Sequence, residues 1–167
     1  MCYTGLAELK SNLLAPKVVV KNGQQEEDTT GAITSSVEPV DFLKSVLEKR
    51  KILGFEEANE GELASFISYS QAFPYNFLAL LDTYDTLQSG VQNFLSVGWA
   101  LYELGYQPVG IRLDSGDLAY LSKKVREAFV KADATIGIGI FTKCTIVVSN
   151  DINEDVLMSL IRDGHSI

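Results

Sequence analysis

Polar side chains, most of them charged, stand at the carboxyl ends of three short apolar runs. The runs are Phe77–Leu81, Val109–Leu113 and Cys144–Val148. The polar residues are Asp82 and Asp85 at the first run, Arg112, Asp114, Ser115 and Asp117 at the second, and Ser149 and Asn150 at the third. In parallel α/β folds, ligands bind beyond the carboxyl ends of the strands. We therefore expect four carboxylates and one guanidinium to face a single cleft.

A cleft of this composition suits a phosphorylated sugar. Carboxylates can hold Mg²⁺ on a diphosphate or accept hydrogen bonds from ribose hydroxyls. Ser115 and Gly116 stand where a helix is expected to begin, and backbone N–H groups at such a place bind anions. Arg112 is the only cation of the set, and it can pair with a carboxylate or phosphate through two hydrogen bonds or stack on a flat ring.

A purely structural interpretation competes with this one. Asp, Ser and Asn are preferred at helix N-caps, so a loop between a strand and a helix uses them without any ligand. Taken singly, each acidic residue fits either role. The pair of Arg112 and Asp114 favours function, because an arginine at the end of a buried strand needs a partner.

The elements that carry these residues form strand–helix units. The apolar runs begin about 30 and about 36 residues apart, the length of a βαβ unit, so the strands should be parallel. Helical periodicity follows the three runs, at 93–104, from 118 and at 156–161, and the last helix should close at Gly164. A fourth strand is expected to begin at His165. A whole (β/α)₈ barrel takes roughly 250 residues, so we expect α/β architecture with about three units of a partial barrel.

The chain divides at residue 36 into two parts. Residues 1–36 are expected to hold a short helix at 6–14, a β-branched strand at 16–21, a turn at Asn22-Gly23 and a polar, acidic linker at 24–36. Residues 37–167 form the partial barrel segment, which begins with two helices. The first should end before Gly54, and the second should run from about Glu60 towards Pro74.

Composition excludes several classes of protein. The 167 residues carry 14 Lys and Arg against 22 Asp and Glu, a net charge of −8, so nucleic acid is not an expected partner. No apolar run is long enough for a membrane helix. Cys2 and Cys144 lie too far apart in sequence for a CxxC pair, which favours a reducing, cytosolic setting.

Three further motifs are weaker indications. The glycine-rich stretch Ile136–Ile140 precedes a strand, whereas a phosphate loop follows one, so it should be a flexible connector. Asp82 and Asp85 are similar to the aspartate pair of haloacid dehalogenase phosphotransferases, but their spacing is one residue too long. His165, the only histidine, is expected at the surface.

Long strings in a fixed order carry a more specific resemblance. They are FPYNFLALLDTYDTLQSGVQNF at 73–94, Gly105-Tyr106, VGIRLDSGDL at 109–118 and IVVSN at 146–150. On these strings the chain resembles nicotinate phosphoribosyltransferases from about Val37 to Gly164, with a weaker similarity from Leu6.

The resemblance implies a type II phosphoribosyltransferase fold, an α/β barrel. The family joins nicotinate to phosphoribosyl diphosphate with coupled ATP hydrolysis, which gives nicotinate mononucleotide and diphosphate for NAD biosynthesis. The resemblance also implies that the protein uses Mg²⁺, forms a homodimer and lies in the cytosol. As a glycosyl-transferring enzyme coupled to ATP, it would have a ligase-type classification.

The resemblance also implies a role for each site residue. Arg112 corresponds to an arginine at the pyridine and ribose site, and Asp114 to the aspartate that orients it. Asp82 corresponds to an aspartate near the diphosphate and its Mg²⁺. Ser115 and Gly116 form the sugar-phosphate turn, and Asn150 lies beside the ribose.

Other parts of the family pattern are not matched. The family's phosphorylated histidine lies upstream of every matched string, and its role is not carried over to His165. The stretch 136–143 is unlike the family and could be an insertion. We therefore expect a fragment or truncated isoform that does not turn over alone. A non-catalytic isoform that associates with full-length subunits and, less favoured, a dehalogenase-type phosphohydrolase are the alternatives.

Overall fold

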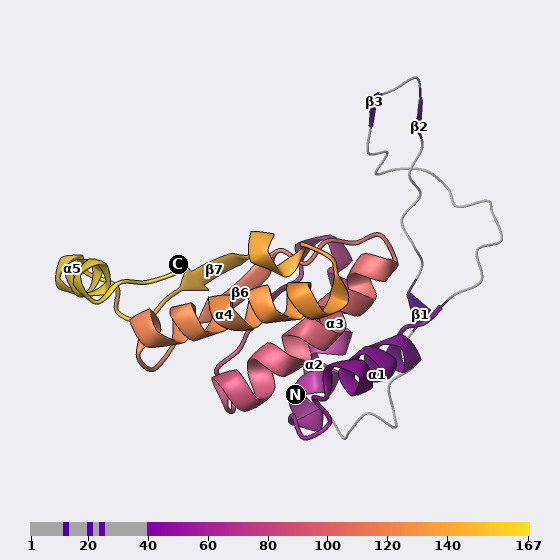
Figure 1. Ribbon diagram of the computed structural model, residues 1–167, viewed down its shortest axis with the longest axis horizontal. Helices are drawn as coiled ribbons and strands as arrows, with labels where there is room; N and C mark the ends of the chain where they lie inside the picture. The colour runs from indigo at the N-terminus through magenta and orange to yellow at the C-terminus, as the bar shows by residue number, and fades with distance from the viewer. Residues whose placement is uncertain (1–11, 14–19, 22–23, 26–39) are drawn as a thin grey trace.

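A computed structural model describes residues 12–13, 20–21, 24–25 and 40–167 (Figure 1). Most of segment 1–36, including the expected turn at 22–23, lies outside these residues, so the division at residue 36 stays a prediction. The first strands are two residues long. β1 (Asn12–Leu13) pairs antiparallel with β4 (Val40–Asp41), and β2 (Val20–Lys21) pairs antiparallel with β3 (Gln24–Gln25). The short helix expected at 6–14 is wrong at its end, where β1 lies, and the linker expected from residue 24 begins with β3.

Both helices expected before the units are present. α1 (Phe42–Leu53) begins where the Asp41 carboxylate accepts the Lys44 N–H, and it ends at Gly54, whose φ of 72° suits glycine. α2 (Glu60–Ala72) begins where the Asn59 side chain accepts the Glu62 N–H. A short helix, η2 (Pro74–Asn76), follows it.

Three strand–helix units follow, as the apolar runs predict. The elements in chain order are β5 (Leu78–Leu80), η3 (Thr86–Gly90), α3 (Val91–Glu103), β6 (Gly110–Leu113), α4 (Leu118–Ile136), η4 (Phe141–Lys143), β7 (Thr145–Val148) and α5 (Glu154–Asp163). The strands are parallel in the order β5-β6-β7. The strand expected at His165 is wrong, because residues 164–167 have no regular structure.

The core lies between the sheet and helices α3 and α4 (Figure 1). Phe77, Phe94, Phe129 and Phe141 are fully buried there, and Phe94 stacks on Phe77 with the ring centroids 5.4 Å apart. The rings of Phe129 and Phe141 also contact Phe94, at centroid distances of 5.6 and 6.1 Å. These four rings hold the second and third units against the first.

One face of the sheet is covered and the other is open. Ala79, Ile111 and Ile146 occupy one row across the strands and are buried under the helices. The adjacent row consists of Leu80, Arg112 and Val147, and all three side chains are exposed. Parallel sheets are normally covered on both faces. The open face is therefore unusual for a parallel sheet. The structure is mixed α/β with a small parallel sheet, and the described residues do not themselves form a closed barrel.

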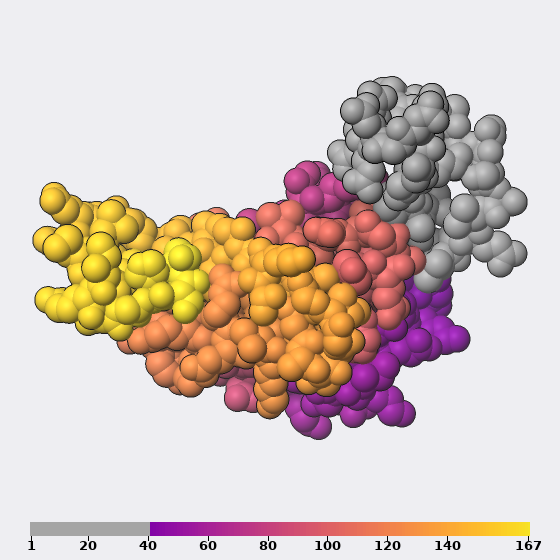
Figure 2. Space-filling view, turned by 45° about the horizontal axis from the view of Figure 1, so that its top comes forward, coloured from indigo at the N-terminus to yellow at the C-terminus, as the bar shows by residue number. Residues whose placement is uncertain are grey.

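Helix α5 lies at one end of the molecule, where the space-filling view shows it extending beyond the body (Figure 2). Only Leu160 of this helix is buried, while Leu157, Met158 and Ile161 are exposed. Among helices between residues 40 and 167, none combines the length and apolar character of a membrane span.

Candidate functional site

The strand register brings the predicted site residues together. Leu80, Arg112 and Val147 are aligned neighbours in β5, β6 and β7. The Leu81 N–H donates to the Arg112 carbonyl at 3.1 Å, and the Ser149 N–H donates to the Leu113 carbonyl at 2.9 Å. Side chains alternate between faces along a strand, so the residues two positions further on share the open face. Two positions after these aligned neighbours come, in the same order, Asp82, Asp114 and Ser149. They therefore lie beside one another at the carboxyl edge.

Arg112, Asp114 and Ser149 form a closed triangle of hydrogen bonds. Arg112 Nη2 donates to Asp114 Oδ1 at 3.1 Å, and Arg112 Nε donates to Ser149 Oγ at 2.6 Å. The Ser149 hydroxyl in turn donates to Asp114 Oδ1 at 2.5 Å. The side chains of Arg112 and Asp114 are 45% and 44% exposed, so a ligand can reach both. The expected pairing of Arg112 with Asp114 is present.

The triangle keeps Asp114 ionised. The hydrogen bond from Ser149, followed by the hydrogen bond from Arg112, holds the pKa of the Asp114 carboxyl below its usual range. Hydrogen bonds and a nearby positive charge stabilise the anion more than the acid. At neutral pH Asp114 is therefore an acceptor and a negative charge.

Asp82 joins the loop after β5 to the loop after β6. Its Oδ2 atom accepts the Asp114 N–H at 2.7 Å and the Ser115 hydroxyl at 2.6 Å. Within residues 40–167, its other carboxylate oxygen has no hydrogen-bond partner. Asp82 thus fixes the loop that carries Asp114 and keeps one oxygen for a ligand.

The other acidic residues of these loops are helix caps. The Asp85 side chain accepts the N–H groups of Leu87 and Gln88, and the Asp117 side chain accepts the Tyr120 N–H. The capping interpretation therefore holds for Asp85 and Asp117. Asp85 is engaged in its own helix, which also gives no support to a dehalogenase-like pair with Asp82.

Gly116 is required by the turn between β6 and α4. Its φ is 78°, a conformation that other residues rarely adopt, and an added Cβ would lie 3.1 Å from Leu121 Cδ1. Ser115 and Gly116 are exposed beside Asp82. The expected sugar-phosphate turn is therefore a tight turn at the carboxyl edge.

Asn150 lies next to the hydrogen-bonded group but outside it. Its side chain is exposed, and its φ of 150° is unusual for a residue other than glycine. Its neighbour Ser149 makes the contacts to Arg112 and Asp114. Side chains alternate between faces along the chain, so Ser149 and Asn150 point to different sides. Which of them faces Arg112 is known only once the pairing of β6 with β7 is known.

Sequence reasoning also missed a buried polar group behind this edge. The Glu62 carboxylate accepts the Ser89 hydroxyl at 2.5 Å and the Asn93 amide at 3.0 Å, and the Asn59 N–H donates to Ser89 Oγ at 3.0 Å. Burial raises the pKa of Glu62, although the two hydrogen bonds to it act in the opposite direction. The group fastens α2 to η3, and η3 follows the loop that begins at Asp82.

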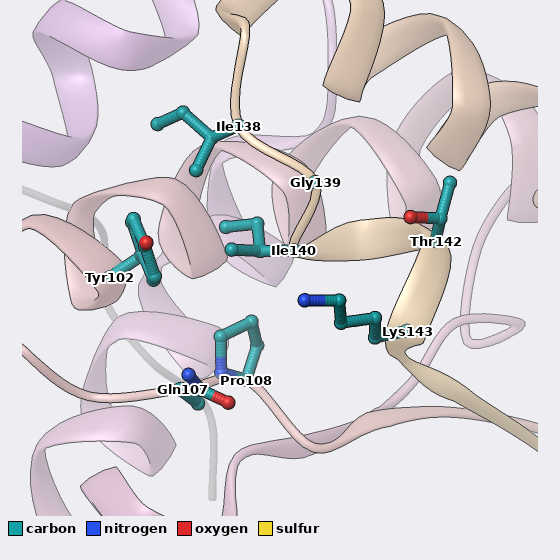
Figure 3. Close-up of a pocket in the computed structure, with 8 residues that line it drawn as sticks. All are labelled: Tyr102, Gln107, Pro108, Ile138, Gly139, Ile140, Thr142 and Lys143. Carbon is teal, nitrogen blue, oxygen red and sulfur yellow. The ribbon is translucent and has the colours of Figure 1, made fainter.

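A separate cleft of about 370 Å³ lies at the amino ends of β6 and β7, on the opposite edge of the sheet (Figure 3). Its lining includes Tyr102, Pro108 and Lys143, and the Lys143 side chain points into it. None of the predicted site residues lines this cleft. Between residues 40 and 167, no cluster of three His, Cys, Asp or Glu side chains could hold a metal ion.

The sequence has close relatives. A nicotinate phosphoribosyltransferase of Caenorhabditis elegans is 40% identical over 190 aligned residues, which include 99% of this chain and 34% of the relative. The Dictyostelium discoideum protein of the same name is 51% identical over 141 residues, 84% of this chain and 23% of the relative. The chain belongs to the nicotinate phosphoribosyltransferase family. No family model matches it.

A solved structure agrees with this family membership. The crystal structure of human nicotinic acid phosphoribosyltransferase superposes with a TM-score of 0.73 at 37% identity, over 84% of this chain and 29% of that one. The resemblance expected from the matched strings is therefore confirmed. The chain spans about a third or less of the curated relatives it matches, 34% of the nematode protein and 21% of the human one.

Proposed function

We propose that this chain carries part of the site in which a nicotinate phosphoribosyltransferase transfers a phosphoribosyl group to nicotinate. The arrangement of Arg112, Asp114 and Ser149 beside Asp82, on one edge of the sheet, is the observation that supports the proposal most strongly. In the reaction the nicotinate ring nitrogen forms a bond to C1 of the ribose. The bond from C1 to the diphosphate breaks, and the diphosphate leaves with the bonding electrons.

The residues of this chain would bind and stabilise the reacting groups. Positive charge develops on the ribose as the diphosphate leaves, and an ionised carboxylate such as Asp114 stabilises that charge. Arg112 has guanidinium N–H groups without partners between residues 40 and 167, and these suit the carboxylate of nicotinate or a phosphate. The backbone of Ser115 and Gly116 would contact the sugar phosphate.

Mg²⁺ fits this site as a metal shared with substrate. Mg²⁺ usually binds one or two carboxylates, water and substrate phosphates rather than a cage of protein ligands. Asp82 offers one carboxylate oxygen that residues 40–167 do not use, and it would hold the metal directly or through water. When bound, the metal would neutralise charge on the leaving diphosphate. ATP is retained as the coupled co-substrate, and no residue of this chain is assigned to it.

A barrel is the proposed setting of the sheet. Leu80 and Val147 are 38% and 36% exposed on the open face, beside Arg112. In a (β/α)₈ barrel this face would be the packed interior. We likewise propose a cytosolic homodimer.

Calorimetric titration with phosphoribosyl diphosphate and Mg²⁺ tests the proposed site. We expect binding by the wild-type chain and a loss of affinity of at least about tenfold in Arg112→Ala and Asp82→Asn, because each loses charge-assisted contacts. Arg162→Ala is the matched control, since Arg162 lies on α5 with its side chain 77% exposed. A folded wild-type chain that binds nothing would refute the proposal.

A second assay tests turnover by the isolated chain. The mixture contains the chain, nicotinate, phosphoribosyl diphosphate, Mg²⁺ and ATP. No residue here is assigned the role of the family's phosphorylated histidine, so we expect no nicotinate mononucleotide. Sustained product formation would show that this expectation is wrong.

A further inference from the structure

We propose that Ser149 is a positioning residue that holds the Arg112 guanidinium in the orientation in which it receives the phosphoribosyl substrate. The proposal rests on the proposed function. Ser149 comes directly after β7, while Arg112 and Asp114 belong to β6 and the loop after it. The serine therefore connects two strands at the point where the site is built.

The serine hydroxyl links the two charged groups in a fixed direction. A hydroxyl has one proton to donate and two lone pairs to accept with. Its proton goes to Asp114 Oδ1 at 2.5 Å, and it accepts the Arg112 Nε proton at 2.6 Å. Asp114 cannot donate when ionised and Arg112 cannot accept, so this is the one direction in which the bridge can form.

The bridge leaves the far side of the guanidinium for a ligand. Arginine has five N–H donors in a planar fork. Nε is used by Ser149, and one Nη2 proton is used by Asp114 at 3.1 Å. The three other donors have no protein partner within residues 40–167. Two anchors on one edge of a rigid plane fix where those three donors point.

An ion pair alone would not fix this orientation. The side chains of Arg112 and Asp114 are almost half exposed, and ion pairs at that exposure are weak because solvent screens them and the side chains keep their freedom. Catalysis and tight binding need groups that are already oriented. The hydrogen bond to Ser149, directly after β7, supplies a second attachment that is separate from the ion pair with Asp114.

The test combines NMR of the arginine side chain with ligand titration on the whole 167-residue chain. Solvent exchange of the Arg112 Nε proton should accelerate about tenfold in Ser149→Ala, because its acceptor is lost, and should return to the wild-type rate in Ser149→Thr. Ser159→Ala is the matched control. Ser159 donates to Asp163 and accepts from Arg162 on α5, an arrangement of the same three residue types away from the site.

Affinity for phosphoribosyl diphosphate with Mg²⁺ should follow the same order. We expect about a tenfold loss in Ser149→Ala, recovery in Ser149→Thr and no change in Ser159→Ala. Unchanged Arg112 exchange in Ser149→Ala would overturn the proposal, as would a loss of affinity that threonine does not rescue. A wild-type chain that binds no phosphoribosyl diphosphate would refute the proposed function, while the exchange rates would still show whether Ser149 holds Arg112.

Discussion

Replacing Gly90 with alanine sets two physical effects against each other. Gly90 ends η3, and its φ and ψ are both −54°, a helical conformation that alanine adopts readily. Helix propensity alone would therefore stabilise the fold by about 1 kcal/mol. The position is buried, however, and an added Cβ would clash with the carbonyl oxygen of Leu81 and lie 2.9 Å from both its Cα and its carbonyl carbon.

The close approach should decide the outcome. Ordinary Cβ contacts begin at 3.4 Å, and the carbonyl oxygen of Leu81 lies well inside that distance, so the two backbones would have to separate by more than half an ångström. Overpacking of this kind costs about 1–3 kcal/mol, and a clash between two backbones favours the upper end, so we expect a net loss of at least about 2 kcal/mol. Leu81 directly precedes Asp82, so the strain would also reach the site.

Urea unfolding followed by circular dichroism measures this free energy. Gly61→Ala is the matched control, because its Cβ would meet the Asn59 side-chain oxygen at 3.3 Å, and a shift of about a tenth of an ångström relieves that contact without breaking the cap of α2. We expect the control to stay within about 1 kcal/mol of wild type, since alanine is the better helix former. A Gly90→Ala chain as stable as wild type would refute the packing argument.

Three further predictions concern buried polar groups. Burial raises the pKa of Glu62, so the stability that this side chain contributes at low pH is lost as the pH rises through its folded-state pKa. In Glu62→Gln the unfolding free energy should not show this fall, and wild-type and variant values that stay parallel as the pH rises would contradict the prediction. The Asp133 carboxylate accepts the N–H groups of residues 140, 141 and 142 at 3.2, 3.1 and 2.8 Å. Asp133→Ala should therefore lower the unfolding free energy in urea by at least about 2 kcal/mol and speed amide exchange at 141, and a smaller loss would count against it. Burial raises the pKa of the Cys144 thiol to about 12, so in a Cys2→Ser background iodoacetamide should label the chain only after unfolding, and rapid labelling of the native chain would be contrary to expectation.

Much of the fold followed from local patterns. Apolar runs and 3.6-residue spacing give the strands and helices, and Gly54 and Pro74 mark where two helices end, because these signals act within a few residues of the chain. Asp133 was missed for the opposite reason. Its carboxylate accepts N–H groups seven to nine residues further along the chain, and these come within reach only after the glycine-rich connector has folded back.

The candidate site divides in the same way. Arg112, Asp114 and Asp82 were predictable from their place after apolar strands. Ser149 was named among the polar residues but not assigned a role, because its role depends on the β6–β7 register, which separates it from Asn150 by one position. Glu62 was missed because its burial comes from the packing of α2 against α3.

Chemical-shift mapping with phosphoribosyl diphosphate and Mg²⁺ tests the account most directly, because the predicted site and the separate cleft lie at opposite edges of the sheet. We predict that backbone amide signals move at residues 82–85, 112–116 and 149–150, at the carboxyl edge. The amides of Tyr102 and Lys143, in the cleft at the amino edge, should not move. Shifts confined to that cleft, or none at all in a folded chain, would contradict the claim that the carboxyl edge binds the phosphoribosyl group.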